Sequence, residues 1–300
     1  MSSLSRRRFL TIAAAGAAIP TGALANVTAR WRGVALGAQT SMQIAGVSER
    51  QAAPVFAAVE QELNRLETIF SLYRTDSELS RLNRDGSLSA PSAELLNVLS
   101  VCSTLHRASG GVFDPSVQPL WAAMARGETG QALDQARAAV GFDAVRFDTT
   151  IVRFVGDTPG QALTLNGIAQ GAITDRISAV LRHHGMRDVL VNMGEVAALG
   201  TRVDGTPWQA GIADPSGQIH QRISLTDRAL ATSAPLGMTL HNHSHILHPN
   251  GQPATHSLAS VSAPSAAVAD GLSTALCLVG PEQAQTLVNQ FPGARIEVLA

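Results

Sequence analysis

The order in which helix-like and strand-like patterns follow one another constrains the fold of this chain more than any other feature. Apolar residues recur at helical spacing from Ser48 to Phe70, and Ser48 with Gln51 predicts a capping box at the start of this helix. Similar patterns predict helices over residues 92–108, 168–184, 266–279 and 281–291. The other predicted elements are a hairpin at 145–155, a buried strand at 188–199 and short strands with Gly and Pro turns at 208–262. This interleaving predicts one mixed α/β domain.

Composition narrows the classes of function that the chain can have. Its formal net charge of −1 gives no electrostatic footprint for nucleic acid. All 22 basic residues are arginine, so neither a phosphate-loop lysine nor a Schiff-base lysine is available. Cys102 and Cys277 lie far apart, which excludes a disulfide framework and a CxxC site. No linker, repeat or low-complexity segment divides residues 26–300, and we expect one domain there.

The first 25 residues have the order of an export signal. Arg6, Arg7 and Arg8 precede Phe9 and a short apolar run, and an Ala-x-Ala site ends at Ala25. Paired arginines followed by Phe-Leu are typical of the twin-arginine route. We therefore interpret residues 1–25 as a twin-arginine signal peptide and expect a periplasmic protein; a general secretion signal or a retained anchor is the alternative. No other apolar stretch is long enough to cross a bilayer, so we do not expect an integral membrane protein.

Two segments carry groups that suit a cation and a phosphate. Asp270 and Thr274 share one helix face at i, i+4, and a carboxylate with a hydroxyl suits Mg²⁺. A carboxylate that stabilises the helix dipole and a threonine bonded to a carbonyl would explain the same pair. Residues 164–171, Thr-Leu-Asn-Gly-Ile-Ala-Gln-Gly, bring two glycines to a helix N-terminus, where backbone amides can meet a phosphate. An ordinary strand-to-helix turn is the alternative there.

Two loop segments are less specific. Residues 110–115, Gly-Gly-Val-Phe-Asp-Pro, combine an aromatic side chain and a carboxylate in a tight turn. Residues 71–80 contain the only tyrosine of the chain, beside an arginine and two acids. Ordinary turn chemistry explains the first segment, and a solvated loop with a helix cap explains the second as well as a binding site does.

A histidine-rich stretch raises the question of a metal site. In His-Asn-His-Ser-His-Ile-Leu-His, an extended strand would place His241, His243 and His245 on one face. Three imidazoles could bind zinc or copper, and an exposed strand edge is the alternative. Ser233 lies shortly before this stretch, but without the Gly-x-Ser-x-Gly context of a hydrolase nucleophile.

Each motif is weak alone, but their order along the chain is informative. Segments that contribute to this order begin at Leu36, Ser71, Gly110, Asn166, Asn192, Ala231, Ser244 and Ala269. Together they resemble the ApbE family of FAD:protein FMN transferases, over nearly all of the chain from about Val34 to Val288. The export signal together with Leu-Asn-Gly-Ile-Ala-Gln-Gly is most similar to the NosX branch, which is linked to nitrous oxide reductase maturation.

The resemblance implies an α+β fold with a largely antiparallel sheet and packed helices. It also implies a reaction in which FAD is split at its pyrophosphate, FMN is joined to a threonine hydroxyl of another protein, and AMP leaves. The implied acceptor is a membrane-associated flavoprotein, such as a NosR-like membrane protein. The implied Mg²⁺ ligands are Asp270, Thr274, the Ser273 region and the backbone carbonyl of Gly167. The implied FAD contacts are Leu36, Val112, Phe113, Asp114, Thr164, Gln170 and Leu247.

His245 matches the histidine of a family segment, and we expect it to accept or relay the threonine proton. The chain departs from the family pattern elsewhere. Gln170 stands where lysine is usual, Thr164 and Asn192 where aspartate is usual, and residues 248–250 (His-Pro-Asn) where Asp-Pro-Arg is usual. Losing the lysine and the arginine removes positive charge near the phosphates, and a glutamine can only donate a hydrogen bond.

Because the implied metal ligands are intact, we expect an active enzyme. Two other functions stay open on the sequence alone. One is an exported FAD-binding or carrier protein that has lost transfer activity. The other is a periplasmic copper-handling protein that uses the histidine-rich stretch.

Overall fold

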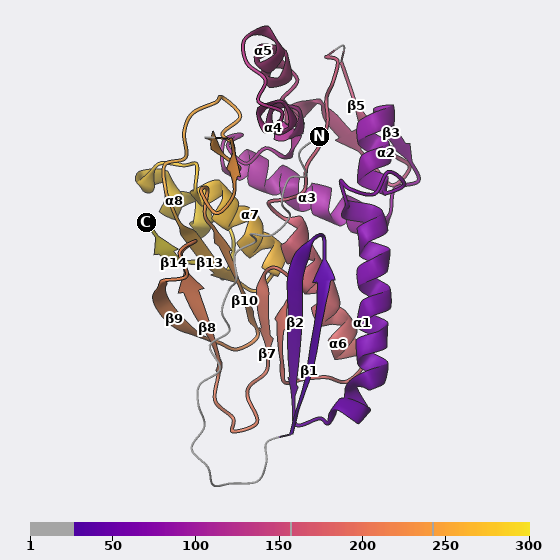
Figure 1. The fold of residues 1–300 in the computed structure, drawn as a ribbon, viewed down its shortest axis with the longest axis vertical. Helices are drawn as coiled ribbons and strands as arrows, with labels where there is room; N and C mark the ends of the chain where they lie inside the picture. The colour runs from indigo at the N-terminus through magenta and orange to yellow at the C-terminus, as the bar shows by residue number, and fades with distance from the viewer. Residues whose placement is uncertain (1–26, 157, 242) are drawn as a thin grey trace.

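A seven-stranded antiparallel sheet forms the centre of the molecule (Figure 1). The computed structural model describes residues 27–300 except 157 and 242, so the predicted signal peptide lies outside the described residues. The strand order is β1-β2-β6-β7-β10-β13-β14, and every neighbouring pair is antiparallel. The strands are β1 (Thr28–Ala35), β2 (Ala38–Ala45), β6 (Val189–Asn192), β7 (Val196–Leu199), β10 (Arg228–Ser233), β13 (Ala259–Ala263) and β14 (Arg295–Leu299). The expected α+β fold with a largely antiparallel sheet is confirmed.

The middle of this sheet is buried on both faces. Val189 and Val191 belong to the main core, whereas Leu190 between them belongs to a second, smaller core. The hairpin of β8 (Trp208–Ala213) and β9 (Ile219–Leu225) covers this second core. There the Trp208 indole N–H donates to the carbonyl oxygen of Leu199 at 3.1 Å. Burial on both faces explains why this part of the sequence reads as a nearly continuous apolar run.

The prediction of one buried strand over residues 188–199 is wrong, because the segment forms two strands. β6 and β7 pair with each other in antiparallel register. The chain reverses between them through Met193, Gly194 and Glu195, and Gly194 has a φ of 106°. Glycine reaches this backbone region without the steric cost that a Cβ would bring. A continuous apolar pattern hides such a turn.

Three helices pack on the main face of the sheet, as Figure 1 shows for α1 (Glu49–Phe70), α6 (Ala169–His183) and α7 (Ala266–Leu276). The predicted capping box is present at the start of α1, where Ser48 and Gln51 bond each other's backbone amides. α3 (Ala93–Ala108) begins after its cap at Ser92, and α8 (Pro281–Asn289) precedes β14. The five predicted helices are thus confirmed, with ends that differ by a few residues.

A smaller layer lies beyond the sheet, at the top of Figure 1. It contains a three-stranded sheet, which confirms the hairpin predicted at 145–155, and three short helices. Its elements are α2 (Glu78–Asp85), β3 (Ser87–Ser89), the 3₁₀ turn η1 (Pro115–Val117), α4 (Gln118–Ala125), α5 (Gln131–Ala138), the 3₁₀ turn η2 (Phe142–Ala144), β4 (Val145–Phe147) and β5 (Ile151–Phe154). Among the described residues, no helix has the length and hydropathy needed to span a membrane.

Candidate active site

The first turn of α6 and the middle of α7 meet beside the end of β10. Asp270 on α7 is buried, and its Oδ2 accepts a hydrogen bond from the backbone N–H of Gly171 at 3.0 Å. Thr274, one turn further along α7, donates from Oγ1 to the carbonyl oxygen of Gly167 at 3.5 Å. A Cβ on Gly167 would lie 3.0 Å from the Thr274 side chain, so glycine allows this approach. The structure therefore places three of the four implied metal ligands in one group.

Two serine hydroxyls complete this group. Ser273 donates from Oγ to the carbonyl oxygen of Asp270 at 2.9 Å, and its Oγ also lies 2.7 Å from the Oγ of Ser233. Ser233 ends β10, and its Oγ is 3.3 Å from Oγ1 of Thr274. Its hydroxyl contacts explain Ser233 without a role as a nucleophile. We call Gly167, Ser233, Asp270, Ser273 and Thr274 the oxygen cluster.

A second buried carboxylate lies near the oxygen cluster, and sequence reasoning missed it. Glu195 occupies the turn between β6 and β7 and is buried. Its Oε2 accepts a hydrogen bond from the backbone N–H of Thr232 at 3.3 Å. Its own carbonyl oxygen accepts from Oγ1 of Thr174 on α6 at 3.3 Å. The available signal was a single acid between two apolar strands, with no basic residue beside it in the sequence.

Burial governs the protonation of both carboxyl groups. Burial, with a smaller contribution from the charge of Asp175, raises the pKa of Asp270 to about 7. Burial also raises the pKa of Glu195 well above its usual range, with the charge of Asp270 adding to the effect. Neither group takes part in the ion pairs of the described chain. A buried carboxylate one helical turn from a threonine hydroxyl that contacts the Gly167 carbonyl oxygen offers oxygen donors of the kind that fit Mg²⁺.

Two of the segments implied as FAD contacts, residues 112–114 and the segment at Thr164, lie side by side. The backbone N–H of Thr164 donates to the carbonyl oxygen of Pro115 at 2.7 Å, which joins the first residue of η1 to the loop before α6. Asp114 is buried and caps η1, since its carboxylate accepts from the backbone N–H groups of Ser116 at 2.7 Å and Phe142 at 3.3 Å. Both oxygens of Asp114 therefore hold the loops in place.

The remaining implied FAD contacts come from other parts of the chain. Gln170 lies in the first turn of α6 against Gly194, where an added Cβ would be 2.6 Å from its Nε2. Leu36 forms the tip of the β1–β2 hairpin, and its N–H donates to Glu67 on α1 at 3.0 Å. Leu247 is half-buried within the histidine-rich stretch. Within the described residues, no hydrogen bond joins Leu36 or Leu247 to the oxygen cluster.

His245 is held in one tautomer by its surroundings. Its Nδ1 lies 2.9 Å from the carbonyl oxygen of Met238 and 3.0 Å from that of Pro235. Because carbonyl oxygens only accept, Nδ1 carries the proton, and Nε2 of the neutral ring is left as the acceptor. Burial lowers the pKa of His245, which favours this neutral form. The ring is therefore prepared to accept a proton at Nε2.

The prediction that His241, His243 and His245 share one strand face is wrong. Among the described residues of the stretch, only β12 (His243–Ser244) is a strand; it pairs with β11 (Thr239–Leu240), which directly precedes the stretch, and His241 lies in the turn between them with a φ of 51°. His241 and His243 are both exposed. In the parts of the chain that the structure describes, no group of three or more His, Cys, Asp or Glu side chains is arranged to hold a metal ion.

Three of the departures from the family pattern share one local geometry. Thr164, Asn192 and His248 each accept a hydrogen bond from the backbone N–H two residues further along the chain, at 3.2, 3.1 and 3.1 Å. An aspartate makes the same contact in an Asx turn. Each of the three side chains therefore supplies the acceptor that an aspartate would supply in such a turn, without a negative charge.

Comparison with known proteins places the chain in one family. The sequence model of the ApbE family matches residues 36–299. The chain is 31% identical over 288 residues to the FAD:protein FMN transferase of Treponema pallidum, covering 82% of this chain and 78% of that protein. It is 29% identical over 251 residues to the FAD:protein FMN transferase of Haemophilus influenzae, covering 75% and 72%.

Solved structures agree with this comparison. The flavin transferase ApbE from Vibrio cholerae superposes with a TM-score of 0.79 and 25% identity, over 91% of this chain and 94% of that one. The apo form of the Pseudomonas stutzeri flavinyl transferase ApbE gives a TM-score of 0.75 and 26% identity, over 89% of each chain. On its sequence and on its fold, the chain belongs to the ApbE family.

Proposed function

We propose that this flavin transferase is an Mg²⁺-dependent FAD:protein FMN transferase that attaches FMN through a phosphoester to a threonine of another protein and releases AMP. The relatives described above are FAD:protein FMN transferases by name. The observation that carries the proposal is the oxygen cluster, in which a buried carboxylate without an ion-pair partner among the described residues lies among hydroxyl and carbonyl oxygens at the start of α6. A helix N-terminus is also where backbone amides can meet a phosphate.

In the proposed reaction, the threonine oxygen forms a bond to the FMN phosphorus. The bond from that phosphorus to the bridging oxygen of the pyrophosphate breaks, and AMP leaves with that oxygen. The hydroxyl proton passes to Nε2 of His245, which the Nδ1 contacts with Met238 and Pro235 leave available. Mg²⁺ held by Gly167, Asp270, Ser273 and Thr274 would neutralise charge on the diphosphate.

The remaining residues have positioning roles in this proposal. Val112, Phe113, Asp114 and Thr164 would contact FAD from the adjoining loops of the smaller layer, and Leu36, Gln170 and Leu247 from the other segments. Gln170 donates a hydrogen bond where the family usually has a lysine charge. Orientation of the two reactants is the main contribution that such contacts make to the rate.

We also propose where the enzyme acts. Its N-terminal arginines and apolar run support export by the twin-arginine route, with function in the periplasm. Its similarity to the NosX branch supports a membrane-associated flavoprotein as acceptor, such as a NosR-like protein in nitrous oxide reductase maturation. Mass spectrometry of the acceptor from cells with and without this protein tests that assignment.

Incubation of the purified protein with FAD, MgCl₂ and an acceptor peptide tests the activity. We expect AMP release and a covalent FMN mass on a threonine peptide, and no modification of a matched peptide with valine in place of threonine. Stoichiometric FAD binding without AMP release would identify a flavin carrier instead. Tight copper binding without flavin, abolished by replacing His241 and His243, would identify a copper-handling protein. These two histidines do not share a strand face with His245, so the three imidazoles do not form the copper site that the alternative requires. This favours the transferase.

A further inference from the structure

Glu195 is a buried carboxylate that the proposed reaction does not use. It is 6% exposed, and its side chain has one hydrogen bond among the described residues, the 3.3 Å contact from the Thr232 amide. A neutral glutamine could accept the same hydrogen bond through its amide oxygen. The contact with Thr232 therefore accounts for an acceptor at this position but not for an ionisable carboxyl group, which is costly to bury without compensation.

The position of Glu195 relates it to the oxygen cluster. Its hydrogen-bond partner Thr232 directly precedes Ser233, whose hydroxyl contacts Ser273 and Thr274. The backbone carbonyl oxygen of Glu195 accepts a hydrogen bond from α6. The N-cap residue of α6 directly follows Gly167, a member of the oxygen cluster. The charge of Asp270 also acts on the Glu195 carboxyl group. Glu195 and Asp270 therefore lie in the same buried region of the protein. Neither carboxyl group forms an ion pair with a basic residue among the described residues.

We propose that Glu195 is an outer-sphere carboxylate of the divalent-cation site: it does not ligate the cation but strengthens its binding. This inference rests on the proposed Mg²⁺ dependence. Mg²⁺ keeps several of its water molecules when a protein binds it, and a carboxylate beyond the ligands can accept hydrogen bonds from those waters. Outer-shell partners of this kind commonly change metal affinity by about 10- to 100-fold. Glu195 is a positioning residue in this account, because it acts through the cation.

Titration of the purified, flavin-free protein with Mn²⁺, followed by electron paramagnetic resonance, tests the proposal. Mn²⁺ is a suitable probe because it shares the preference of Mg²⁺ for oxygen ligands in octahedral geometry. The variant is Glu195→Gln, which keeps the acceptor for the Thr232 amide and removes the charge. The matched control is Glu282→Gln, the same change at an exposed carboxylate in the first turn of α8.

We expect Glu195→Gln to weaken Mn²⁺ binding at least tenfold, and Glu282→Gln to leave it unchanged. The metal-free Glu195→Gln protein should melt at or above the temperature of the metal-free wild type, because an ionisable carboxyl group, which is costly to bury, has been replaced by a neutral amide. A Kd within twofold of the wild type would overturn the proposal, and so would failure of the metal-free variant to fold. Absence of Mn²⁺ binding by the wild type would instead overturn the metal dependence, and the role of Glu195 with it.

Discussion

Asp270 combines a stability cost with the metal-binding role that we propose for it. Its carboxylate is 3% exposed and accepts one hydrogen bond, from the Gly171 amide, while burial raises its pKa to about 7. A group that prefers to be neutral at this position lowers the stability of the metal-free protein at neutral pH. A cation at the oxygen cluster would remove this penalty, which ties the proposed cofactor to the stability of the fold.

The pH dependence of stability should report this directly. With a folded-state pKa near 7 and an unfolded value of 3.8, metal-free folded protein binds more protons than the unfolded chain across this window. Stability contributed by Asp270 is therefore full below about pH 4 and is lost as pH rises through about 7. We expect Asp270→Asn to lose this dependence and to exceed the wild type at pH 8 in EDTA by roughly 2–4 kcal/mol. Urea unfolding at pH 5 and pH 8 measures the difference, and equal pH slopes would contradict it.

His245 gives a second prediction at the level of single residues. Because its Nδ1 proton is bonded to backbone carbonyls, its Nε2 can act as the base. We expect His245→Ala to bind FAD as the wild type does and to transfer FMN about 10²- to 10⁴-fold more slowly. Transfer rates at saturating FAD, with the exposed His243→Ala as the control, measure this effect. Full-rate transfer by His245→Ala would remove the proposed role.

Local sequence patterns can predict only some of the site. Asp270 and Thr274 share a helix face by spacing, and the glycines near Gly167 mark a close approach, so both segments stand out in the sequence. Glu195 does not, because its contact with Thr232 joins residues far apart in the chain. The hydroxyl contacts of Ser233 depend in the same way on the pairing of β10 with its neighbours.

At the level of elements, the β6–β7 turn links the sheet to the first turn of α6. Gly194 has a φ of 106°, and a Cβ there would lie 2.5 Å from Cδ of Gln170. The turn therefore requires glycine for its backbone and for the space that Gln170 occupies. It also sets the position of Glu195, the next residue.

Gly194→Ala should therefore destabilise the protein by about 1–3 kcal/mol and displace Gln170. Gly205→Ala is the control, because Gly205 has a φ of 76° but an added Cβ meets no atom within 4 Å. We expect the control to show the smaller loss, due to backbone strain alone. Urea unfolding of both variants measures the two losses. Equal losses would mean that the contact with Gln170 is unimportant.

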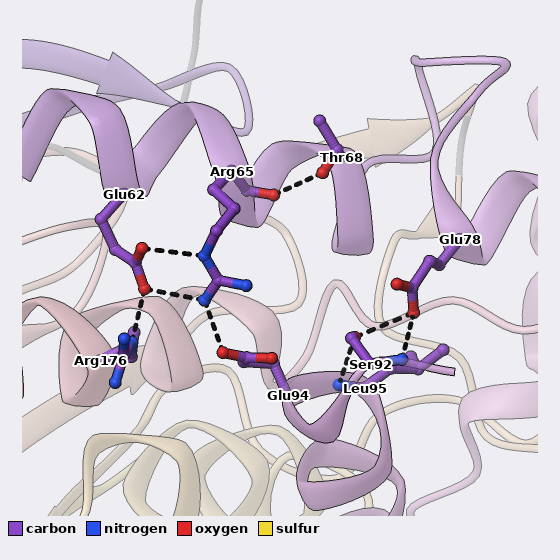
Figure 2. A network of polar contacts seen from close by, with 8 residues as sticks. All are labelled: Glu62, Arg65, Thr68, Glu78, Ser92, Glu94, Leu95 and Arg176. Atoms are coloured by element: carbon purple, nitrogen blue, oxygen red, sulfur yellow. Dashed lines mark hydrogen bonds and ion pairs between the residues drawn. The ribbon is translucent and has the colours of Figure 1, made fainter. Parts of the chain in front are cut away.

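An ion-pair network joins three helices at the polar surface of α1. Figure 2 shows Glu62 and Arg65 of α1 meeting Glu94 of α3 and Arg176 of α6. Hydrogen bonds from Arg65, and then from Arg176, hold the pKa of Glu62 at about 2. The same view shows Glu78 of α2 accepting hydrogen bonds from Ser92 at the start of α3. These contacts fix the helices against one another.

This network predicts a loss of stability in acid. Because the folded pKa of Glu62 is below its usual 4.5, its contribution is present above about pH 4.5 and is lost as pH falls towards 2. Glu62→Gln should cost about 1 kcal/mol at pH 7, and the difference from the wild type should vanish near pH 2. Chemical unfolding across this range measures it. A difference that stays constant with pH would show that the charge of Glu62 contributes nothing.

Over the whole molecule, long elements are predictable from the sequence and short ones are not. The helices with sustained apolar periodicity, such as α1 and α6, match their predictions closely. The eight-residue helices α2, α4 and α5 are too short for a clear period, and α5 buries no residue. The β1–β2 hairpin was not predicted; its tip has positive φ at both Leu36 and Gly37. The prediction of three histidines on one strand face was wrong because the turn at His241 interrupts the strand.

The architecture brings these separate segments to one place. The central sheet positions Glu195 and Ser233 at the ends of β7 and β10, while α6 and α7 bring Gly167 and Asp270 towards them. No single segment contains a complete site. The activity that we propose is therefore a property of the folded molecule, and it depends on carboxylate, hydroxyl and carbonyl oxygens acting together.

Simultaneous measurement of AMP and protein-bound FMN tests this account most directly. The purified protein is incubated with FAD, MgCl₂ and a threonine-bearing acceptor protein, and intact mass and nucleotide release are followed in the same reaction. We expect one AMP for each FMN attached to threonine, with both products lost on chelation of Mg²⁺ or in Asp270→Ala. AMP release with no covalent FMN, or transfer that continues without Mg²⁺ and Asp270, would contradict it.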